Sequence, residues 1–323
     1  TYPYNFTVAG TVTLGANVTI DGHADAATTA GGAQSYGGFD AGAFTAIFGT
    51  ASGAADAVAI TGTQADFNDS TVHGVVTATA GPGAVTATGG ASFDGITSGS
   101  IALFGTGQVD VDGPIDVSGN VSIPAGMELE QTAPGASDID GTLDISGTYQ
   151  ITTGAGSLSV DGNVTIDATG TLDTTDDSDL NFAADFTGGT FANADDDDVV
   201  FNTPSGGSTI AFKPGTTLNT LTVNGANRTA TFTESVTVDS GVTLGDDTIV
   251  DLQENSLILS GGDLLLTDDA SVTNSGSNGS VQFTGSAAQV IDVTGTPTTN
   301  PTLKNLVINN SATAPAVNVI DAL

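Results

Sequence analysis

The sequence predicts an all-β protein, a parallel β-helix or β-solenoid rod with a less regular β-rich region at its N-terminal end. Three observations carry this prediction. No window keeps apolar residues at the i, i+3, i+4, i+7 spacing of an amphipathic helix, short alternating strands recur between small turn residues, and a segment of about 85 residues repeats. Short, evenly spaced strands are typical of a sandwich, a barrel or a solenoid, and the long repeat favours the solenoid.

A four-residue alternating phrase after Gly or Asn marks the expected strands. It reads TVTL after Gly10, and it reads NVTI, NVSI and NVTI at residues 17–20, 120–123 and 163–166. Side chains alternate between the two faces of a strand. We therefore expect these apolar side chains to point into the core: Val121, Ile123, Val164, Ile166, Val236, Val238, Leu257 and Leu259. The Asn and Thr of these turns are equally explained as N-glycosylation sequons or as turn ladders, in which their side chains bond the backbone of neighbouring coils.

The long repeat aligns TLNTLTVNG at residues 217–225 with TLKNLVINN at 302–310, an offset of 85. We expect the apolar residues of the two copies to occupy the same interior places, Leu218, Leu221 and Val223 matching Leu303, Leu306 and Ile308. The second copy reaches only its midpoint at Leu323. A solenoid that stops there exposes a coil edge, so we expect the natural chain to continue with a strand pair like residues 235–244.

Four segments follow from these patterns. Residues 1–105 are irregular, β-rich and richer in Ala and aromatic residues, and they form either a cap or tip region or ordinary coils with long loops. Residues 106–198 are solenoid coils. Residues 199–280 are repeat copy 1, and residues 281–323 are the incomplete copy 2.

Charge excludes several classes of partner. The chain has 37 Asp and Glu against 3 Lys and Arg, and its net charge is -34. Such a surface cannot neutralise phosphates, so we expect no binding to nucleic acid and no insertion into an anionic membrane. The chain starts at Thr1 rather than Met, and its self-repulsion is best tolerated where salt screens it. We therefore expect an extracellular or cell-surface location in a marine or high-salt setting.

The repeat also carries a resemblance to a known group of proteins. VQFTGSAAQVIDVTG at residues 281–295 and TLKNLVINNS at 302–311 resemble the β-solenoid repeat modules of large secreted surface adhesins and filament proteins of Bacteroidota, many of them cargo of the type IX secretion pathway. The resemblance covers residues 199–323 and, more loosely, 105–198. It implies a β-solenoid displayed on a cell surface, and no catalytic residue carries over.

Reactive side chains are too few for the common enzyme classes. Lys213, Arg228 and Lys304 are the only cations, and His23 and His73 are the only histidines. A polysaccharide lyase needs Arg or Lys at its centre, and a zinc site needs three or four close ligands. The many acids supply chance pairs for a glycosidase, but Trp is absent. We therefore predict that the protein is not an enzyme.

Calcium is the one cofactor that the sequence suggests. The pattern D-x-D-G-x-x-D occurs twice, and Ca²⁺ takes six to eight oxygen ligands of the kind that Asp-rich turns supply. The predicted metal ligands are Asp110, Asp112, Asp116, Asp138, Asp140 and Asp144. Weaker acidic candidates are residues 195–198 and the pairs 176–177, 246–247 and 268–269. The alternative for each cluster is a solvated acidic loop.

These observations predict a structural or adhesive segment of a long extracellular cell-surface fibre, built of stacked β-solenoid repeats and mediating attachment or surface contact. The expected partners are further copies in a homo-oligomer or fibre, and surface glycans or neighbouring cells. Two alternatives remain open. One is a glycan-binding module of a secreted protein, supplied by the aromatic-rich first 105 residues, and the other is a viral tail fibre or spike.

Overall fold

The computed structural model describes residues 6–20, 34–49, 57–62, 64–78, 84–132, 135–152, 156–174, 179–188, 190–192, 198–298, 301–313 and 316–321. The chain divides into two compact units, which we describe separately: unit 1 is Thr1–Leu158 with Thr169–Thr175, and unit 2 is Ser159–Ala168 with Asp176–Leu323. His23, the acidic residues 176–177 and 195–197, and the aromatic residues Tyr2 and Tyr4 lie outside the described residues.

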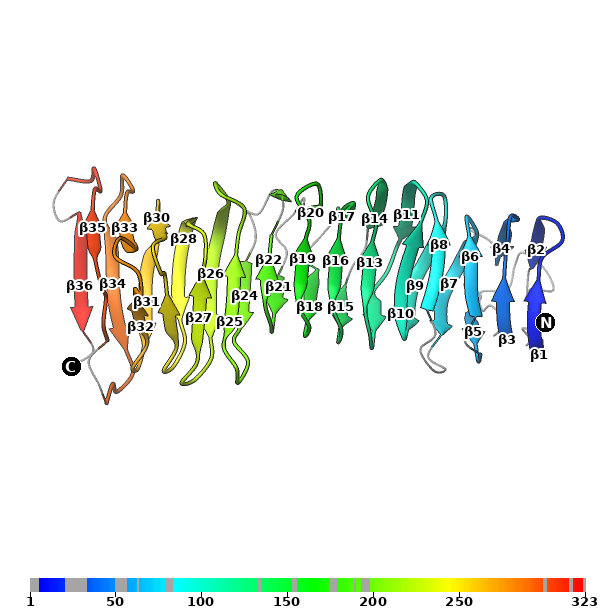
Figure 1. Ribbon diagram of the computed structural model, residues 1–323, viewed down its shortest axis with the longest axis horizontal. Coiled ribbons are helices and arrows are strands. Elements are labelled where there is room, and N and C mark those ends of the chain that lie inside the picture. Colours follow the sequence, from blue (N-terminus) through cyan, green and yellow to red (C-terminus); the bar gives the residue numbers. More distant parts are fainter. Residues whose placement is uncertain are drawn as a thin grey trace, which may run out of the picture. The chain divides into compact units, whose positions relative to one another are not determined.

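The predicted fold class is confirmed. The described residues form strands and turns but no helix, and the strands pair in parallel as stacked coils of a β-solenoid (Figure 1). A parallel ladder needs a connection that carries the chain back to the start of the next strand, and the coil supplies it. None of the described segments is a helix of the length and hydropathy needed to span a membrane.

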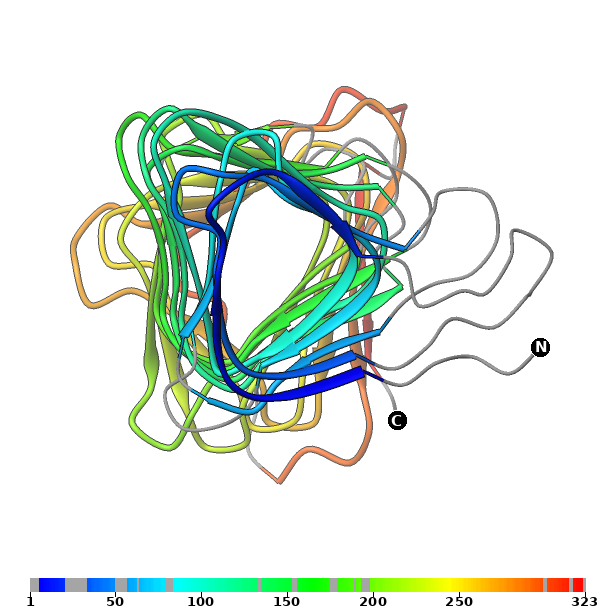
Figure 2. The same ribbon diagram turned by 90° about the vertical axis from the view of Figure 1, so that its right-hand side faces the viewer.

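Unit 1 builds three parallel stacks of strands. The first stack is β1, β3, β5, β7, β9, β12 and β15. The second is β1, β3, β6, β8, β10, β13 and β16, and the third is β2, β4, β7, β9, β11, β14, β17 and β20. Some strands belong to two stacks because they bend round a corner. Seen end-on, the coils of this unit lie over one another (Figure 2).

The strands of unit 1 are β1 (Phe6–Thr13), β2 (Val18–Ile20), β3 (Gln34–Asp40), β4 (Ala46–Phe48), β5 (Val58–Ile60), β6 (Gln64–Asn68), β7 (Thr71–Ala78), β8 (Ala84–Thr88), β9 (Ser92–Ser98), β10 (Ser100–Phe104), β11 (Gly107–Val111), β12 (Ile115–Val117), β13 (Val121–Ile123), β14 (Met127–Gln131), β15 (Ala136–Ile139), β16 (Leu143–Ile145), β17 (Thr148–Ile151) and β20 (Thr171–Thr174). The boundary between the units falls within β18 (Ser157–Val160).

Unit 2 also builds three stacks, named here A, B and C. Stack A is β21, β24, β26, β28, β31, β34 and β36. Stack B is β26, β28, β30, β33 and β35, and stack C is β19, β22, β25, β27, β29 and β32. The strands β26 and β28 bend round the corner between stacks B and A, with a register shift between Leu218 and Thr220.

The strands of unit 2 are β19 (Val164–Ile166), β21 (Asp179–Phe182), β22 (Phe186–Thr187), β23 (Thr190–Ala192), β24 (Asp198–Asn202), β25 (Ser208–Ala211), β26 (Thr217–Asn224), β27 (Thr229–Phe232), β28 (Val236–Leu244), β29 (Ile249–Asp251), β30 (Ser256–Leu259), β31 (Asp263–Thr267), β32 (Ser271–Thr273), β33 (Ser280–Phe283), β34 (Gln289–Thr294), β35 (Leu306–Ile308) and β36 (Val317–Asp321).

The core of each unit lies inside its coils. The eight apolar side chains expected to point inward are all at most 2% exposed, which confirms that prediction. Aromatic rings fill the interior as well. In unit 1 Tyr36, Phe39, Phe48, Phe67 and Phe93 are buried and contact one another in series, with the Phe39 and Phe48 ring centres 5.2 Å apart. Contacts of this kind contribute about 0.5–1.5 kcal/mol beyond the burial of the rings.

The long repeat keeps its strand pairing but moves to another face of the coil. In copy 1 Phe201 pairs with Val223 in stack A, and in copy 2 Phe283 pairs with Ile308 in stack B. The prediction that the two copies occupy the same interior places is therefore wrong about the face of the coil. Each strand nevertheless pairs with the equivalent partner strand in the two copies. The reason is coil length, which is 21 residues from Leu221 to Val242 but 27 from Leu264 to Ile291. A repeat of about 85 residues is not a whole number of such coils.

Candidate functional site

The six predicted calcium ligands all lie on the outer surface of unit 1. Asp110 is in β11 and Asp116 is in β12, and these two strands pair with successive parts of the same strand, β9. Asp110 is opposite Ser92 and Asp116 is opposite Thr97. Because β9 bends round a corner between these two positions, Asp110 lies in the third stack and Asp116 in the first, so the two carboxylates are on different faces of the coil.

The structure instead brings together acids of the two copies of the motif. Asp116 and Asp138 are direct partners in the ladder between β12 and β15. Neighbouring strands are about 4.8 Å apart, so these two carboxylates lie one above the other on the outer face. Asp144, the last ligand of the second motif, is opposite Ser122 on another stack. Among the described residues, no three His, Cys, Asp or Glu side chains are grouped closely enough to hold a metal ion.

The glycine of each motif has a packing role. A Cβ atom on Gly113 would lie 2.0 Å from the Asp94 carbonyl oxygen, and one on Gly141 would lie 2.3 Å from the Gly119 carbonyl oxygen. Side-chain atoms do not approach backbone oxygens this closely, so the corner of the coil accepts only glycine. The D-G step of the motif is therefore explained by the stacking of corners. The remaining corner acids, Asp112 and Asp140, are exposed, and Thr132 donates a hydrogen bond to Asp112.

Two clusters of charged side chains lie on the outer surface of unit 1. On β11, β14 and β20, burial raises the pKa of Glu128 above its ordinary value, and the carboxylates of Glu130, Asp110 and Asp173 add to this shift. Gln108 lies between two of these acids, donating a hydrogen bond to Asp110 at 2.7 Å and another to Glu130.

The second cluster joins β7, β9 and the corner that follows β11. Burial raises the pKa of Asp94, the charge of His73 acts against this shift, and that of Asp112 adds to it. His73 is half-buried and is the one histidine among the described residues. One histidine beside two acids does not form the close set of three or four ligands that zinc takes.

The weaker acidic pairs 246–247 and 268–269 meet at one corner of unit 2. Desolvation raises the pKa of Asp246, and the carboxylates of Asp247, Asp268 and Asp269 contribute in the same direction. Asn227 donates a hydrogen bond to Asp247 at 3.3 Å, and the N–H of Thr296 donates one to Asp268 at 2.6 Å. Both contacts link successive coils, so these acids act as corner acceptors.

Asparagine plays the same part in the repeated NVTI and NVSI phrases. The side-chain oxygen of Asn120 accepts a hydrogen bond from the N–H of Thr142 in the next coil at 2.9 Å, and Val121 donates to the Thr142 carbonyl at 2.8 Å. Asn17 and Asn163 make the same contact with Thr45 and Asp185, at 3.1 and 3.4 Å. These contacts are turn ladders, one of the two explanations that the sequence offered for the recurring Asn. The phrase recurs because each copy fastens a corner to the coil that follows.

Other corner acceptors do not share the asparagine signal and were not predicted. Ser70, Ser137 and Ser235 accept hydrogen bonds from the N–H groups that begin neighbouring strands, and Asp185 and Asp263 do the same. What they share is a short polar side chain at or just before the start of a strand. That position is the signal by which sequence could have identified them.

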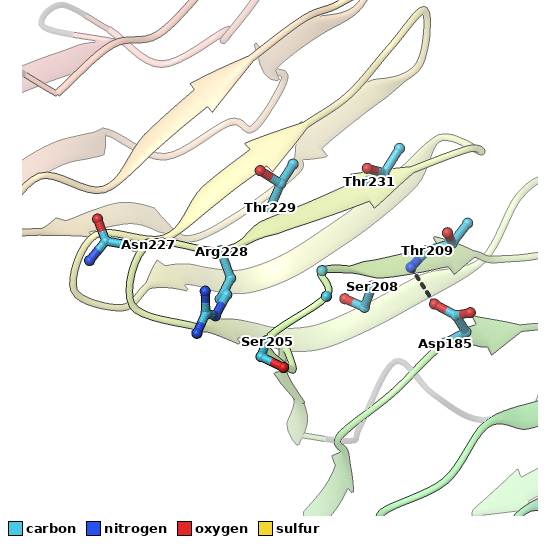
Figure 3. Close-up of a pocket in the computed structure, with 10 residues that line it drawn as sticks. Asp185, Ser205, Ser208, Thr209, Asn227, Arg228, Thr229 and Thr231 are labelled. Atoms are coloured by element: carbon cyan, nitrogen blue, oxygen red, sulfur yellow. Dashed lines mark hydrogen bonds between the residues drawn. The ribbon is translucent and has the colours of Figure 1, made fainter.

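A polar pocket of about 490 Å³ opens on the surface of unit 2 at the start of β25 and β27 (Figure 3). Two turns border it, and in each an N–H bonds back three residues, from Gly207 to Pro204 and from Arg228 to Gly225. Its lining is Asp185, Ser205, Gly206, Gly207, Ser208, Thr209, Asn227, Arg228, Thr229 and Thr231. Within the described residues Arg228 makes no ion pair, and it shares the lining of the pocket with the Asp185 carboxylate and five Ser and Thr residues (Figure 3).

The aromatic residues of the first 105 positions do not form a sugar platform in the described part of the chain. The rings from Tyr36 to Phe93 named above are at most 1% exposed because they form the core. Phe104, which is 53% exposed, lies at the end of β10 on the outer surface. Packing therefore explains these five rings, whereas Tyr2 and Tyr4 lie outside the described residues.

Comparison with known proteins returns no match to this chain, whether with protein-family models, curated proteins or solved structures.

Proposed function

We propose that this chain is a structural and adhesive segment of an extracellular cell-surface fibre, with a non-catalytic role in attachment or surface contact. The observation that carries the proposal is the division of each coil into an apolar interior and a polar outer face, repeated along both units. In such a solenoid each coil contacts only its neighbours, so length is gained by adding coils. The resemblance to Bacteroidota surface repeats supports the same role, and the charge of -34 supports a location where salt is abundant.

We further propose that the contact surface for glycans is the polar pocket beside Arg228. The Ser and Thr hydroxyl groups, the Arg228 guanidinium and the Asp185 carboxylate of its lining are suited to hydrogen-bond the hydroxyl groups of a polysaccharide. Arg228 is one of only three cations in the chain, so it provides a local exception to the acidic surface.

Adhesion is tested with beads that carry the purified chain. We expect these beads to resist shear on alginate-coated glass better than beads carrying albumin. Replacement of Arg228 by Ala should reduce their retention several-fold. The matched control is Lys213→Ala, which removes the same charge from a side chain that already bonds Thr190 at 2.9 Å. Equal retention of the chain and albumin on alginate, chitin and cell layers would contradict the adhesive role.

A further inference from the structure

The asparagine corners coincide with a second sequence signal. The pattern N-x-S/T is the acceptor signal for N-linked sugars on the surface of secreted proteins. Exposure and hydrogen bonding decide which copies of the signal are open to a transferase on the folded chain. The copies begin at Asn5, Asn17, Asn68, Asn120, Asn163, Asn227, Asn278 and Asn309.

At three of these positions the contact with the next coil uses only the oxygen of the asparagine amide. Asn120 accepts the N–H of Thr142 through Oδ1 at 2.9 Å, and Asn17 and Asn163 accept an N–H of their next coils in the same way. All three side chains are exposed, and within the described residues their Nδ2 atoms make no hydrogen bond. Because oxygen and nitrogen are the two branches of one planar group, fixing the oxygen leaves the nitrogen available for another bond.

The hydroxyl residue of the signal faces outward at the same three corners. Residues two apart in a strand point to the same face of the sheet. Thr19 and Ser122 are exposed and Thr165 is half-buried, whereas the intervening Val121 and Val164 are in the core. Both polar parts of the signal are therefore presented on the outer surface.

In two other copies of the signal the amide nitrogen already serves as a donor. Asn68 donates through Nδ2 to the Phe44 carbonyl at 3.4 Å, and Asn227 donates through Nδ2 to Asp247 at 3.3 Å. Ser70, which completes the signal of Asn68, is fully buried as well. A sugar on Nδ2 takes the place of one of its hydrogens, so it would crowd the acceptor at each of these corners.

The remaining copies lack another part of the arrangement. Ser280 completes the signal of Asn278, but it is 5% exposed and its hydroxyl bonds that of Ser256 at 3.2 Å. No hydrogen bond between described residues fixes the side chain of Asn309, and Asn5 lies outside the described residues. The structure thus separates three copies of the signal from the other five.

We propose that Asn17, Asn120 and Asn163 are acceptor sites for N-linked glycans on the folded chain. In the transfer, Nδ2 forms a bond to the anomeric carbon of an oligosaccharide carried by a polyprenyl diphosphate. The bond between that carbon and the diphosphate oxygen breaks, the diphosphate leaves with the electron pair, and the amide loses one proton to a base of the transferase. The product keeps the amide carbonyl, so Oδ1 still accepts the N–H of the next coil. The turn ladder and the sugar use different atoms of one side chain.

This modification rests on the extracellular location proposed above, because transferases of this class act on exported chains. It is separable from adhesion. Glycan transfer is measured in solution on the purified chain, whereas adhesion is measured on coated glass with a chain that carries no sugar. Failure of one experiment therefore leaves the outcome of the other unaffected.

Glycan transfer to the folded chain tests the proposal. The full chain is purified from a host without N-glycosylation and incubated with an oligosaccharyltransferase and its lipid-linked donor. Synthetic peptides that span each site give the occupancy that the sequence alone allows. Peptide-N-glycosidase in heavy-oxygen water then converts every occupied Asn to labelled Asp, which peptide mass spectrometry locates. Relative to the peptides, we expect the occupancy of the three proposed sites to exceed several-fold that of Asn68, Asn227 and Asn278.

Ser122 provides matched variants. Ser122→Ala removes the signal of Asn120 without removing its contact with Thr142, so it should abolish transfer to Asn120 alone, and Ser122→Thr should retain it. Circular dichroism establishes that each variant is folded. Thermal unfolding tests the shared use of the amide, because the glycosylated chain should melt no lower than the unmodified chain.

Three outcomes overturn the proposal. In the first, the peptides are glycosylated but the three sites of the folded chain are not. In the second, Asn68, Asn227 and Asn278 are glycosylated as fully as the three sites in the folded chain. In the third, the sugars lower the melting temperature, which would mean that they displace the contact with the next coil.

Discussion

At the corners of the coil, single residues decide how one coil is fastened to the next. The strand ladder is interrupted where the backbone turns, and the N–H groups there need another acceptor. Asn120 supplies one to Thr142 while the following residue, Val121, bonds the Thr142 carbonyl. Both the N–H and the carbonyl of Thr142 are thus hydrogen-bonded to the preceding coil. The same arrangement recurs at Asn17 and Asn163.

Replacing Asn120 by Ala removes the acceptor and leaves the Thr142 N–H to water. Because the contact is exposed, we expect the free energy of unfolding to fall by only about 0.5–1 kcal/mol. Chemical denaturation measures the change. Ser122→Ala is the control, since Ser122 is exposed two residues further along. If the two variants lose the same stability, Asn120 does not fasten the corner.

Tyr149 is the second residue whose removal has a predictable cost. Its hydroxyl donates to the side-chain oxygen of Gln131 at 2.8 Å, and Gln131 in turn donates to Gly113 and Ser137, all inside unit 1. Tyr149→Phe leaves a buried oxygen without a donor, and we expect a loss of about 1–3 kcal/mol in denaturation. Burial raises the pKa of Tyr149, so its ultraviolet titration should coincide with alkaline unfolding. Ionisation at an ordinary tyrosine pKa in the folded protein would contradict this burial.

Whether sequence could predict these residues depends on how local their role is. The asparagine corners were predictable because the phrase that contains them recurs. The Tyr149 and Gln131 pair was not, because its members are separated by 18 positions and meet only through the stacking of β14 on β17. The calcium prediction relied on spacing within one strand and its turn. Stacking brings together acids from different coils instead, Asp116 with Asp138.

At the scale of the strand, carboxylates repel one another on the outer face of β11, β14, β17 and β20. Burial and the neighbouring acids raise the pKa of Glu128 in the folded chain, so the folded protein holds this proton more tightly than the unfolded chain does. The contribution of Glu128 to stability therefore falls as pH rises through its ordinary pKa and toward its raised value.

Glu128→Gln removes the carboxylate and with it the cost of holding this charge partly buried beside other acids. At pH 7 we expect the variant to be more stable than the parent by roughly 0.2–1 kcal/mol, a small gain because the side chain is largely solvated. The gain should vanish near pH 3, where the carboxyl is protonated in both states, and should shrink in 1 M salt. Thermal unfolding across this pH range measures it. Asp144→Asn is the control, because it removes the same charge from another stack of unit 1. An equal gain in stability from this variant would show that the lower net charge, and not relief of repulsion on the β11–β20 face, is the cause.

Strand existence and orientation were the most predictable features, because alternation of Val, Ile and Leu with Thr, Ser and Asp fixes which side is buried. The face of the coil on which a strand lies was not predictable. It depends on the summed length of every corner before it, and those corners vary in length without a marker in the sequence. This is why Leu306 and Ile308 keep the neighbours of Leu221 and Val223 but lie in stack B instead of stack A.

At the scale of the whole molecule, charge and cations dominate. A net charge of -34 opposes compaction, so we expect the melting temperature to rise with NaCl. Calcium remains a prediction of the sequence. At matched ionic strength we expect CaCl₂ to raise the melting temperature further, because ligands that bind only the folded state add about 2.7 kcal/mol at a hundredfold excess over Kd.

Two double variants locate that effect. Asp112→Asn with Asp140→Asn removes the corner acids, and Asp116→Asn with Asp138→Asn removes the stacked pair of β12 and β15. We expect the second to blunt the calcium response more than the first, since only its carboxylates are directly opposed. Differential scanning calorimetry compares them. If Mg²⁺, Ca²⁺ and ionic-strength-matched NaCl shift the melting temperature equally, the effect of calcium is charge screening and not binding at a site.

The displacement of the repeat from one face to another has an evolutionary consequence. Because stacks A and B accept equivalent strands, a duplicated stretch of gene need not contain whole turns to be foldable. A copy that is too short by a third of a turn still finds a face to join. The heritable building block of this protein is therefore the single strand with its corner, and chains of almost any length are reachable by small duplications.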